Sequence, residues 1–434
     1  MGSDCWDDTL SRRGFIKAAA GVPLFLAASR FSGAFAAGSD TIRIGLIGSG
    51  ERGHHDMAKC LKAAPGLELV AMGDLFKDRL DNTLERFRKE NEKEPEKIKV
   101  TPETCFVGWD AYQKVLATDC HLVLLTTPPQ FRPLHLRAAL EAGKHVFIEK
   151  PVAVDPVGVR HVIESADLAD QKNLTILAGT QARRMEHRRE LVKRIQNGDI
   201  GEIISGQCVR TGDAMRTWGI QERKPEMTDM EWQVRRWLFN TWLSGDFIAE
   251  MHIHELDITN WLIGEHPVKC MGIGGRQVRT DTKMFGDVYD HFSIMYEYPN
   301  GVQVSYLGEQ IDAATAKTYE KIRGTKGTAY TDWSTSKIEG EKPFAWEGPS
   351  NDPEIQQFKD QIEAIRNGTK LNEAKRVAES TMTAILGRMS CYTGLELKWD
   401  WAMKSSKLDL TPEKYEFGPR PEPVIALPGK TQIV

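Results

Sequence analysis

The chain has 434 residues, of which 41% are hydrophobic and 27% are charged, and its formal net charge is -4. This is the composition of an ordinary globular protein, which excludes collagen-like, low-complexity and wholly disordered chains. The near-neutral charge argues against a dedicated nucleic-acid-binding protein, which would need a basic stripe. No run of about 18 apolar residues follows the first 40 positions, so we expect no membrane span there. The length predicts two domains.

The N-terminus carries a predicted export signal. Residues 11–17 read S-R-R-G-F-I-K, which matches the twin-arginine pattern S-R-R-x-F-L-K. An apolar run too short to span a membrane follows, and Ala34-Phe35-Ala36 supplies an A-x-A cleavage site. We therefore predict a twin-arginine signal peptide over residues 1–36 and a periplasmic or secreted protein. That compartment permits disulfides, but the cysteine spacing leaves their pairing open.

Residues 40–152 alternate short apolar runs with helical patterns. Near-continuous apolar runs are typical of parallel strands that are buried on both faces. The predicted strands are 42–47, 67–72, 122–126 and 145–148, and the predicted helices lie near 51–64, 77–92 and 132–142. This alternation predicts a Rossmann domain, an α/β fold with a doubly wound parallel sheet.

The pattern changes over residues 153–395, where we predict a second, α+β domain. Asn300-Gly301, which lies between two strand patterns, is a strong hairpin signal and favours a largely antiparallel open sheet. The predicted strands are 175–178, 203–211, 268–278, 291–298, 302–308 and 320–323, and the predicted helices are 157–172, 353–366 and 373–392. Residues 396–434 are rich in proline at their end and are predicted to form an extended C-terminal arm.

A dinucleotide-binding fingerprint follows the first predicted strand. Residues 48–53 read G-S-G-E-R-G: Gly48 permits a tight turn, Gly50 lets the backbone approach a pyrophosphate, and Gly53 allows close helix–strand packing. Asp74 ends the second strand, where a carboxylate would bind the adenosine ribose diol and repel a 2′-phosphate. This favours NAD over NADP, against the plainer alternative of a glycine-rich turn and an N-capping Asp74.

Further runs carry a family resemblance. Thr126-Thr127-Pro128-Pro129 ends the third strand, A-G-K-H-V follows at 142–146, and Glu149-Lys150-Pro151 comes after the fourth strand. Together they resemble the Gfo/Idh/MocA oxidoreductases over residues 41 to about 390. The resemblance implies a nicotinamide-dependent enzyme for sugars, glycosides or polyols, with a small carbohydrate substrate as its partner. It also implies a homo-oligomer formed through the C-terminal sheet.

The resemblance also assigns roles in the first domain. It implies that Thr127, Pro128, Glu149 and Lys150 contact the cofactor, and that Lys150 exchanges a proton with the reacting hydroxyl. Lys150 also stands at the C-terminal end of a predicted parallel strand, where open α/β sheets place their ligands. A lone lysine would otherwise be interpreted as a solvated side chain.

Residues 250–257 read E-M-H-I-H-E-L-D and resemble the family pattern D-x-G-x-H-x-x-D. His254 falls on the catalytic histidine, Glu250 on the first acid and Asp257 on the second. At about 100° per residue we expect these three on one helix face, as a general base with carboxylates to orient it. His252 would lie about 160° from His254, which opposes a metal site made with Glu250 and His291, and we predict none.

Three other residues are predicted to contact substrate. Gln181 and Arg183 follow a predicted strand and could line the pocket at its C-terminal end. Trp237 precedes the histidine segment and could stack a sugar ring, although tryptophan is equally a core residue. Arg132 stands where the family has a histidine, so we expect the departure to bear on substrate choice.

These observations predict an exported NAD-dependent oxidoreductase that acts on a sugar, glycoside or polyol hydroxyl, such as C3 of a glycoside. Because a dinucleotide has no dependable supply outside the cytoplasm, we expect NAD to be held tightly. The alternative is a redox-neutral, glycoside-cleaving enzyme of the α-N-acetylgalactosaminidase type, which would oxidise, eliminate, add water and reduce again. A non-catalytic sugar sensor is a third, less favoured interpretation.

Overall fold

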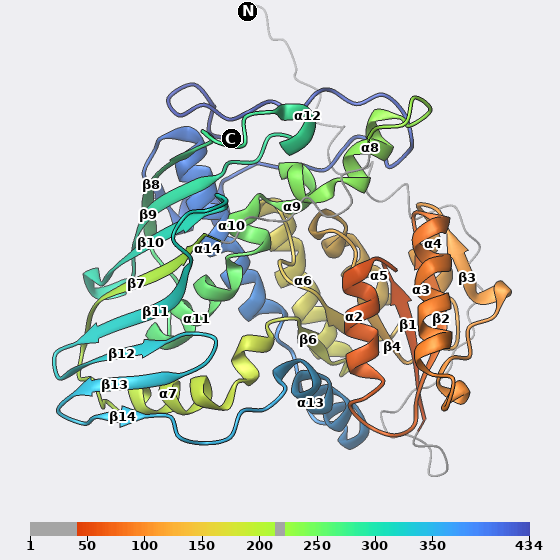
Figure 1. Ribbon diagram of the computed structural model, residues 1–434, viewed down its shortest axis with the longest axis horizontal. Coiled ribbons are helices and arrows are strands. Elements are labelled where there is room, and N and C mark those ends of the chain that lie inside the picture. The colour runs from red at the N-terminus through yellow and green to blue at the C-terminus, as the bar shows by residue number, and fades with distance from the viewer. Residues whose placement is uncertain (1–40, 213–221) are drawn as a thin grey trace, which may run out of the picture. The chain divides into compact units, whose positions relative to one another are not determined.

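The computed structural model describes residues 41–212 and 222–434, and the predicted signal peptide lies outside them. Two sheets organise the described chain (Figure 1). One has six strands in the order β3-β2-β1-β4-β5-β6, and the other has nine in the order β14-β13-β12-β11-β7-β10-β9-β8-β15. Within the described residues, no helix is both long and apolar enough to cross a membrane.

The six-stranded sheet is parallel throughout, which confirms the predicted Rossmann fold. Its strands are β1 (Ile42–Ile47), β2 (Leu67–Asp74), β3 (Cys105–Val107), β4 (Leu122–Leu125), β5 (His145–Ile148) and β6 (Ile176–Ala178). The helices of this region are α2 (Glu51–Cys60), α3 (Lys77–Glu90), α4 (Ala111–Leu116), α5 (Arg132–Glu141) and α6 (Pro156–Lys172). The sheet continues past residue 152, because β6 pairs with β5 after the crossover through α6. Sequence periodicity had placed β6 with the second domain.

The nine-stranded sheet is mostly antiparallel, as predicted, except that β7 and β10 run parallel. Its strands are β7 (Ile203–Thr211), β8 (Lys269–Gly275), β9 (His291–Glu297), β10 (Gln303–Glu309), β11 (Lys317–Gly324), β12 (Gly327–Thr331), β13 (Ser336–Gly340), β14 (Phe344–Ala345) and β15 (Leu397–Lys398). Asn300 and Gly301 have φ angles of 62° and 74°, which lets the chain turn tightly between the antiparallel β9 and β10 and confirms the predicted hairpin.

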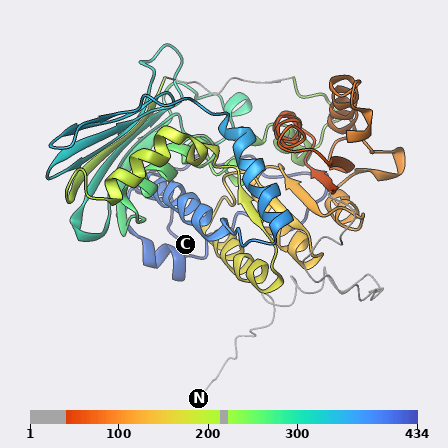
Figure 2. The same ribbon diagram turned by 90° about the horizontal axis from the view of Figure 1, so that it is seen from below.

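Helices cover one face of this sheet (Figure 2). Those that pack on it are α7 (Glu186–Gln196), α11 (Ile253–Ile263) and α14 (Ala374–Thr393). The remaining helices are α8 (Asp229–Arg235), α9 (Thr241–Ser244), α10 (Phe247–Glu250), α12 (Thr282–Phe285), α13 (Pro353–Asn367) and α15 (Trp399–Lys404). Short 3-10 turns occur at Pro95–Lys97, Pro102–Thr104, Pro129–Phe131, Gln181–Arg184, Trp237–Phe239 and Pro299–Gly301.

Two late segments return to the first sheet. Helix α13 packs on α2, and the Phe358 ring lies 4.6 Å from the Phe147 ring of β5. Residues 405–434 form neither helix nor strand and run past α12 and α8 (Figure 1). Leu410 of this arm donates its backbone N–H to Asp155, 2.8 Å away. Residues from the last quarter of the chain therefore pack against the Rossmann domain.

Candidate active site

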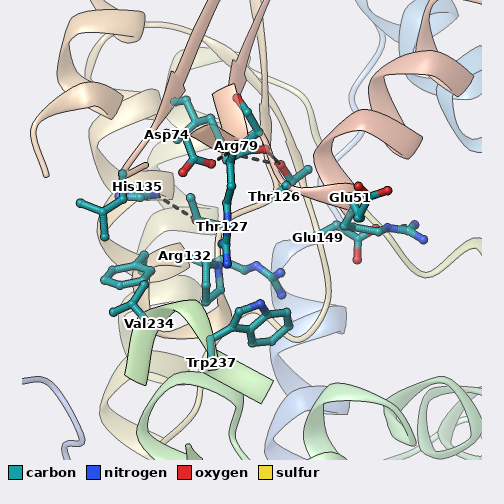
Figure 3. Close-up of a pocket in the computed structure, with 18 of the residues that line it drawn as sticks. Glu51, Asp74, Arg79, Thr126, Thr127, Arg132, His135, Glu149, Val234 and Trp237 are labelled. Atoms are coloured by element: carbon teal, nitrogen blue, oxygen red, sulfur yellow. Dashed lines mark hydrogen bonds and ion pairs between the residues drawn. The ribbon is translucent and has the colours of Figure 1, made fainter. Parts of the chain in front are cut away.

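A cavity of about 800 Å³ opens at the C-terminal ends of the parallel strands. Open α/β sheets bind their ligands at this edge, beside the point where the strand order reverses between β1 and β4. In Figure 3, Asp74, Thr127, Arg132 and Trp237 follow one another down the pocket. The predicted residues that line it are Gly48, Gly50, Asp74, Thr127, Pro128, Glu149, Lys150, Gln181, Trp237, Glu250 and His254.

The glycine loop has the backbone geometry that the fingerprint predicts. Gly48 has φ +98°, and a Cβ there would lie 2.7 Å from the Thr127 backbone nitrogen. A Cβ on Gly53 would lie 2.0 Å from the Gly48 carbonyl oxygen, so only glycine fits. At Gly50 no atom lies within 4 Å of such a Cβ, and no side chain caps α2 there. The helix therefore presents uncapped backbone N–H groups to open space, which suits a pyrophosphate.

Asp74 links the end of β2 to the glycine loop. One carboxylate oxygen accepts the Ser49 backbone N–H at 2.6 Å, and the other accepts that of Phe76 at 2.8 Å. Burial raises the pKa of this carboxyl, although both hydrogen bonds act to lower it. Both oxygens retain lone pairs toward the pocket that Asp74 lines, so the carboxylate can accept a pair of ribose hydroxyls.

The loop after β4 borders the same space. Thr126 donates its hydroxyl to the Gly48 carbonyl at 2.6 Å, which ties this loop to the glycine turn. Thr127 shares a hydrogen bond of 3.1 Å with His135, whose pKa burial lowers to about 3. Arg132 is buried and donates to the Pro151 carbonyl at 2.6 Å, so it braces the turn that carries Lys150.

Lys150 and Glu250 meet in the pocket although they are 100 residues apart in the chain. The Lys150 ammonium donates to the Glu250 carboxylate at 3.2 Å and also to the Glu250 backbone carbonyl. Each of the two side chains is only about a tenth exposed. The adjacent Glu149 accepts the Lys150 backbone N–H at 3.0 Å and the Arg52 guanidinium at 2.8 Å. Glu250 thus holds the ammonium of Lys150, and Glu149 holds its backbone N–H.

His254 lies beside this pair on α11 and lines the pocket. Burial lowers the pKa of its imidazole well below the usual value, and the positive charges of Lys150 and Arg210 lower it further. The buried Nδ1 atom has no hydrogen-bond partner among the described residues. A neutral imidazole has a lone pair that can accept a proton, so His254 is in the protonation state of a general base, and its lowered pKa makes it a weaker base than an ordinary histidine.

The helix expected to carry Glu250, His254 and Asp257 on one face is broken. Helix α10 ends at Glu250 and α11 begins at Ile253, so the three do not share one continuous helix. His252 lies at the break and is fully buried, with one ring nitrogen 2.6 Å from the Tyr306 hydroxyl and the other 3.1 Å from Gln310. Packing of this ring at the break, where the family has glycine, opposes regular helix through 251–252.

Asp257 points to a different set of partners. It forms bidentate hydrogen bonds of 2.7 and 3.0 Å with Arg183, and it also binds Arg376 at 3.0 Å and the Ser380 hydroxyl at 2.6 Å. Burial acts to raise its pKa, but the two guanidinium groups outweigh burial and lower it. Asp257 and Arg183 are not among the residues that line the cavity, so the two predicted contacts pair with each other.

Two pocket residues were missed by sequence reasoning. Arg210 on β7 donates to Glu255 at 3.0 Å and to the Met251 carbonyl at 2.9 Å. Trp333, in the turn between β12 and β13, packs edge-on against His254 with ring centroids 5.7 Å apart. Neither residue belongs to a recognisable motif, and the only signal at Trp333 is the polar turn around it.

Comparison with known proteins agrees with this geometry. Residues 42–179 match a profile described as "Oxidoreductase family, NAD-binding Rossmann fold", and residues 189–330 match the GFO/IDH/MocA C-terminal domain. The chain belongs to the Gfo/Idh/MocA family of oxidoreductases, and its first domain is an NAD-binding Rossmann domain.

Individual relatives share about a quarter of their aligned residues with this chain. An inositol 2-dehydrogenase from Burkholderia lata is 26% identical over 267 residues, which are 61% of this chain and 66% of that protein. Inositol 2-dehydrogenase 3 from Saccharopolyspora erythraea is 25% identical over 264 residues, 61% of this chain and 65% of that protein. The matched segment thus spans just under two thirds of these relatives' own length.

Solved structures share the fold. The aldose–aldose oxidoreductase from Caulobacter crescentus superposes with a TM-score of 0.63 at 16% identity, covering 82% of this chain and 99% of that one. Levoglucosan dehydrogenase, solved with NADH and levoglucosan, superposes with a TM-score of 0.64 at 17% identity, again covering 82% of this chain and 99% of that one. At these identities the likeness concerns the fold alone.

Proposed function

We propose that this protein is an NAD-dependent oxidoreductase that oxidises a hydroxyl group of a sugar, glycoside or polyol, including the C3 hydroxyl of a glycoside. The observation that carries the proposal is the meeting of Lys150, Glu250 and His254 in the pocket that also contains the glycine loop. The inositol, aldose and levoglucosan enzymes named above act on ring-shaped polyhydroxy compounds, which supports this substrate range.

The side chains can move the hydroxyl proton. Lys150 is held as a donor by Glu250, so its ammonium can hydrogen-bond the reacting oxygen and stabilise negative charge that develops there. His254 is neutral and can accept the proton from that oxygen. The glycine loop and Asp74 would hold NAD, which would supply a hydride acceptor for the carbon that bears the hydroxyl.

Mass spectrometry of the products formed from a panel of glycosides, sugars and polyols tests the proposal. A product that has lost two hydrogens identifies a dehydrogenase. Release of a free sugar would instead identify the redox-neutral, glycoside-cleaving alternative. If every compound is returned unchanged, neither reaction takes place and the proposed function fails.

Selectivity for NAD over NADP is proposed to depend on Asp74. Its buried carboxylate occupies the end of β2, where a 2′-phosphate would meet negative charge. Arg79 lines the same pocket but already donates to the Arg235 backbone carbonyl at 3.2 Å, so it is less available to a phosphate. We therefore expect tighter binding of NAD.

Retention of NAD through turnover is also proposed, and the C-terminal arm supports it. The Tyr415 ring of the arm lines the pocket and lies 5.8 Å from the Trp109 ring and 5.5 Å from the Phe131 ring. Further along, Arg420 donates to Gln233 at 3.0 Å, just before the end of α8. The arm thus joins the Rossmann domain to the α8 segment beside the pocket, and we propose that this contact slows the release of a bound dinucleotide.

Retention of NAD predicts two measurable properties of the protein. Purified protein should carry near-stoichiometric NAD(H), and a carbonyl acceptor should reoxidise the reduced cofactor in place, so that many turnovers need no added NAD. Tyr415→Ala should speed release of NADH by roughly tenfold, whereas Val424→Ala, on the exposed part of the same arm, should not. A stable apo-protein whose activity follows added NAD would contradict retention.

A homo-oligomer is proposed through the face of the nine-stranded sheet opposite the helices. Met271, Ile273, Met295 and Leu307 are between 42% and 76% exposed there. The strand register places Met271 opposite Met295, and both Ile273 and Leu307 opposite Ser293, so the four form one apolar patch. Light scattering should show that the parent protein is a multimer and that the Ile273→Lys variant is dissociated. A parent protein and a variant that are both monomers would contradict the proposed oligomer.

Export by the twin-arginine route remains a proposal that is supported by the S-R-R-G-F-I-K sequence at residues 11–17. Replacement of Arg12 and Arg13 by lysine should abolish recovery of the processed protein from the periplasm. Equal recovery of both forms would contradict the assignment.

A further inference from the structure

The turn that carries Trp333 is held rigidly. One oxygen of Asp332 accepts the backbone N–H groups of Ser334 at 2.7 Å and Thr335 at 2.9 Å, and its other oxygen accepts the Tyr330 hydroxyl at 3.0 Å. Trp333 follows Asp332 directly, so its backbone is fixed between β12 and β13.

The indole ring is fixed as well. Its N–H donates to Glu255 at 3.1 Å, and the Arg188 guanidinium lies 5.2 Å from its ring centroid. Glu255 and Arg188 are both fully buried, so neither partner can move without disturbing the core. The Arg210 guanidinium also holds Glu255, which strengthens the anchor for the indole.

This anchored ring nevertheless remains 37% exposed and lines the pocket beside His254. Leaving a large indole in water gives up hydrophobic stabilisation that burial would provide. The fixed orientation of this exposed indole ring therefore indicates that a ligand covers it. Its 5.7 Å separation from the His254 ring places that ligand next to the proposed base.

We propose that Trp333 is the stacking surface for the ring of a cyclic substrate, a pyranoside or a cyclitol, in preference to an open-chain polyol. Pyranose and cyclitol rings present axial C–H bonds on a flat apolar face, which contacts an indole favourably. The hydroxyls then project from the rim of the ring toward Lys150 and His254. An open-chain polyol has no such face and gains less from Trp333. This inference rests on the proposed function and narrows its substrate class.

Kinetics of Trp333→Ala and Trp333→Phe on a methyl pyranoside and on the open-chain polyol of the same configuration test the inference. Trp333→Ala should raise KM for the pyranoside about tenfold, equivalent to about 1.4 kcal/mol, and change kcat less than about threefold. Trp333→Phe, which keeps an aromatic face, should stay within about threefold of the parent KM. Neither variant should alter KM for the polyol. Trp346→Ala, which removes a half-buried tryptophan outside the pocket, is the matched control.

Calorimetry separates failure of this inference from failure of the proposed function. The NAD-loaded protein should bind the methyl pyranoside, and Trp333→Ala should weaken this binding to the same extent as KM, with NADH affinity unchanged. If no hydroxyl is oxidised but this Trp333-dependent binding persists, the stacking surface stands and the oxidoreductase proposal falls. Equal effects of Trp333→Ala on ring and open-chain ligands, or a parent protein that prefers the open-chain polyol, would overturn the inference.

Discussion

Glu250 and Asp257 are two buried acids on either side of His254, and their surroundings differ completely. Glu250 faces the pocket, and the ion pair that its carboxylate forms within residues 41–212 and 222–434 is with Lys150, at 3.2 Å. Asp257 faces away from the pocket and is held by two arginines and a serine. A carboxylate with one partner at a cavity can exchange that partner for substrate, whereas a carboxylate that accepts four hydrogen bonds from three residues holds the fold together. We therefore expect catalysis to depend on Glu250 and stability to depend on Asp257.

The largest expected effect is the loss of turnover when Lys150 or His254, the two residues beside Glu250 in the pocket, is replaced. Lys150→Ala and His254→Ala should each reduce turnover about 10²-fold or more, because the Lys150 ammonium stabilises the charge that develops on the hydroxyl oxygen and His254 accepts its proton. NADH should remain bound, since the glycine loop and Asp74 are untouched. Steady-state kinetics with NADH fluorescence titration measures both. Near-normal turnover in both variants would remove these residues from the mechanism.

Matched amide substitutions compare the two acids directly. Asp257→Asn should lower the free energy of unfolding by about 3–5 kcal/mol, because it removes the buried carboxylate that pairs with Arg183 and Arg376, whose side chains are only 12% and 25% exposed. Turnover of the folded variant should change less than Glu250→Gln changes it. Denaturant unfolding and steady-state kinetics of both variants provide the test, and a Glu250→Gln variant that loses more stability than Asp257→Asn would reverse the assignment.

The same acid predicts a pH dependence of stability. Because the folded-state pKa of Asp257 is lowered, its contribution is fully present above its unfolded pKa of about 3.9 and is lost as the pH falls through the folded value. The difference in unfolding free energy between the parent and Asp257→Asn should therefore be constant near neutrality and shrink only below about pH 4. A difference that shrinks near pH 6 would show that another group is responsible.

Asp74 is a third buried carboxylate, and it extends the comparison to the cofactor. Asp74→Ala should narrow the ratio of NAD to NADP affinity by roughly tenfold, since it removes a hydrogen-bond acceptor for the ribose and a negative charge together. Fluorescence titration with NADH and NADPH gives the ratio. If the parent protein already binds NADPH more tightly, Asp74 does not select the cofactor.

The smallest expected effect concerns His254, which lies between the two acids. Because its pKa is lowered well below the usual value, it stays neutral through the range in which an ordinary histidine titrates. The profile of kcat/KM against pH should therefore change less than about twofold around pH 6.5, the ordinary pKa of histidine. An acidic limb centred there, absent from His254→Gln, would show that the imidazole titrates normally.

Local sequence signals predicted where the glycine loop, Asp74 and Lys150 lie on the parallel sheet, and all three line one cavity. The glycine loop, Asp74 and the strand that precedes Lys150 depend on neighbours within one β-α unit, so short motifs specify them. The hairpin at Asn300-Gly301 is confirmed for the same reason, because the turn is defined by two residues. Family membership, read from the same motifs, is also confirmed.

The part of the pocket that His254 and Trp333 line depends on contacts between distant segments, which no local sequence pattern contains. Helical periodicity placed Asp257 beside His254, and both lie on α11, but Arg183, Arg376 and Ser380 bind the Asp257 carboxylate outside the pocket. Trp333 reaches the pocket only because the register of β12 and β13 places their turn next to α11. The outcome in both cases depends on contacts between elements that are far apart in the sequence, which helical periodicity does not contain.

Deuterium transfer tests the central claim most directly. The NAD-loaded protein would be given a methyl pyranoside that carries deuterium on the ring carbons, and the nicotinamide would be analysed by mass spectrometry after a single turnover. The account predicts reduced NAD with one deuterium, an equal amount of oxidised sugar, and neither product from Lys150→Ala. A sugar that binds but leaves the nicotinamide oxidised and unlabelled would contradict it.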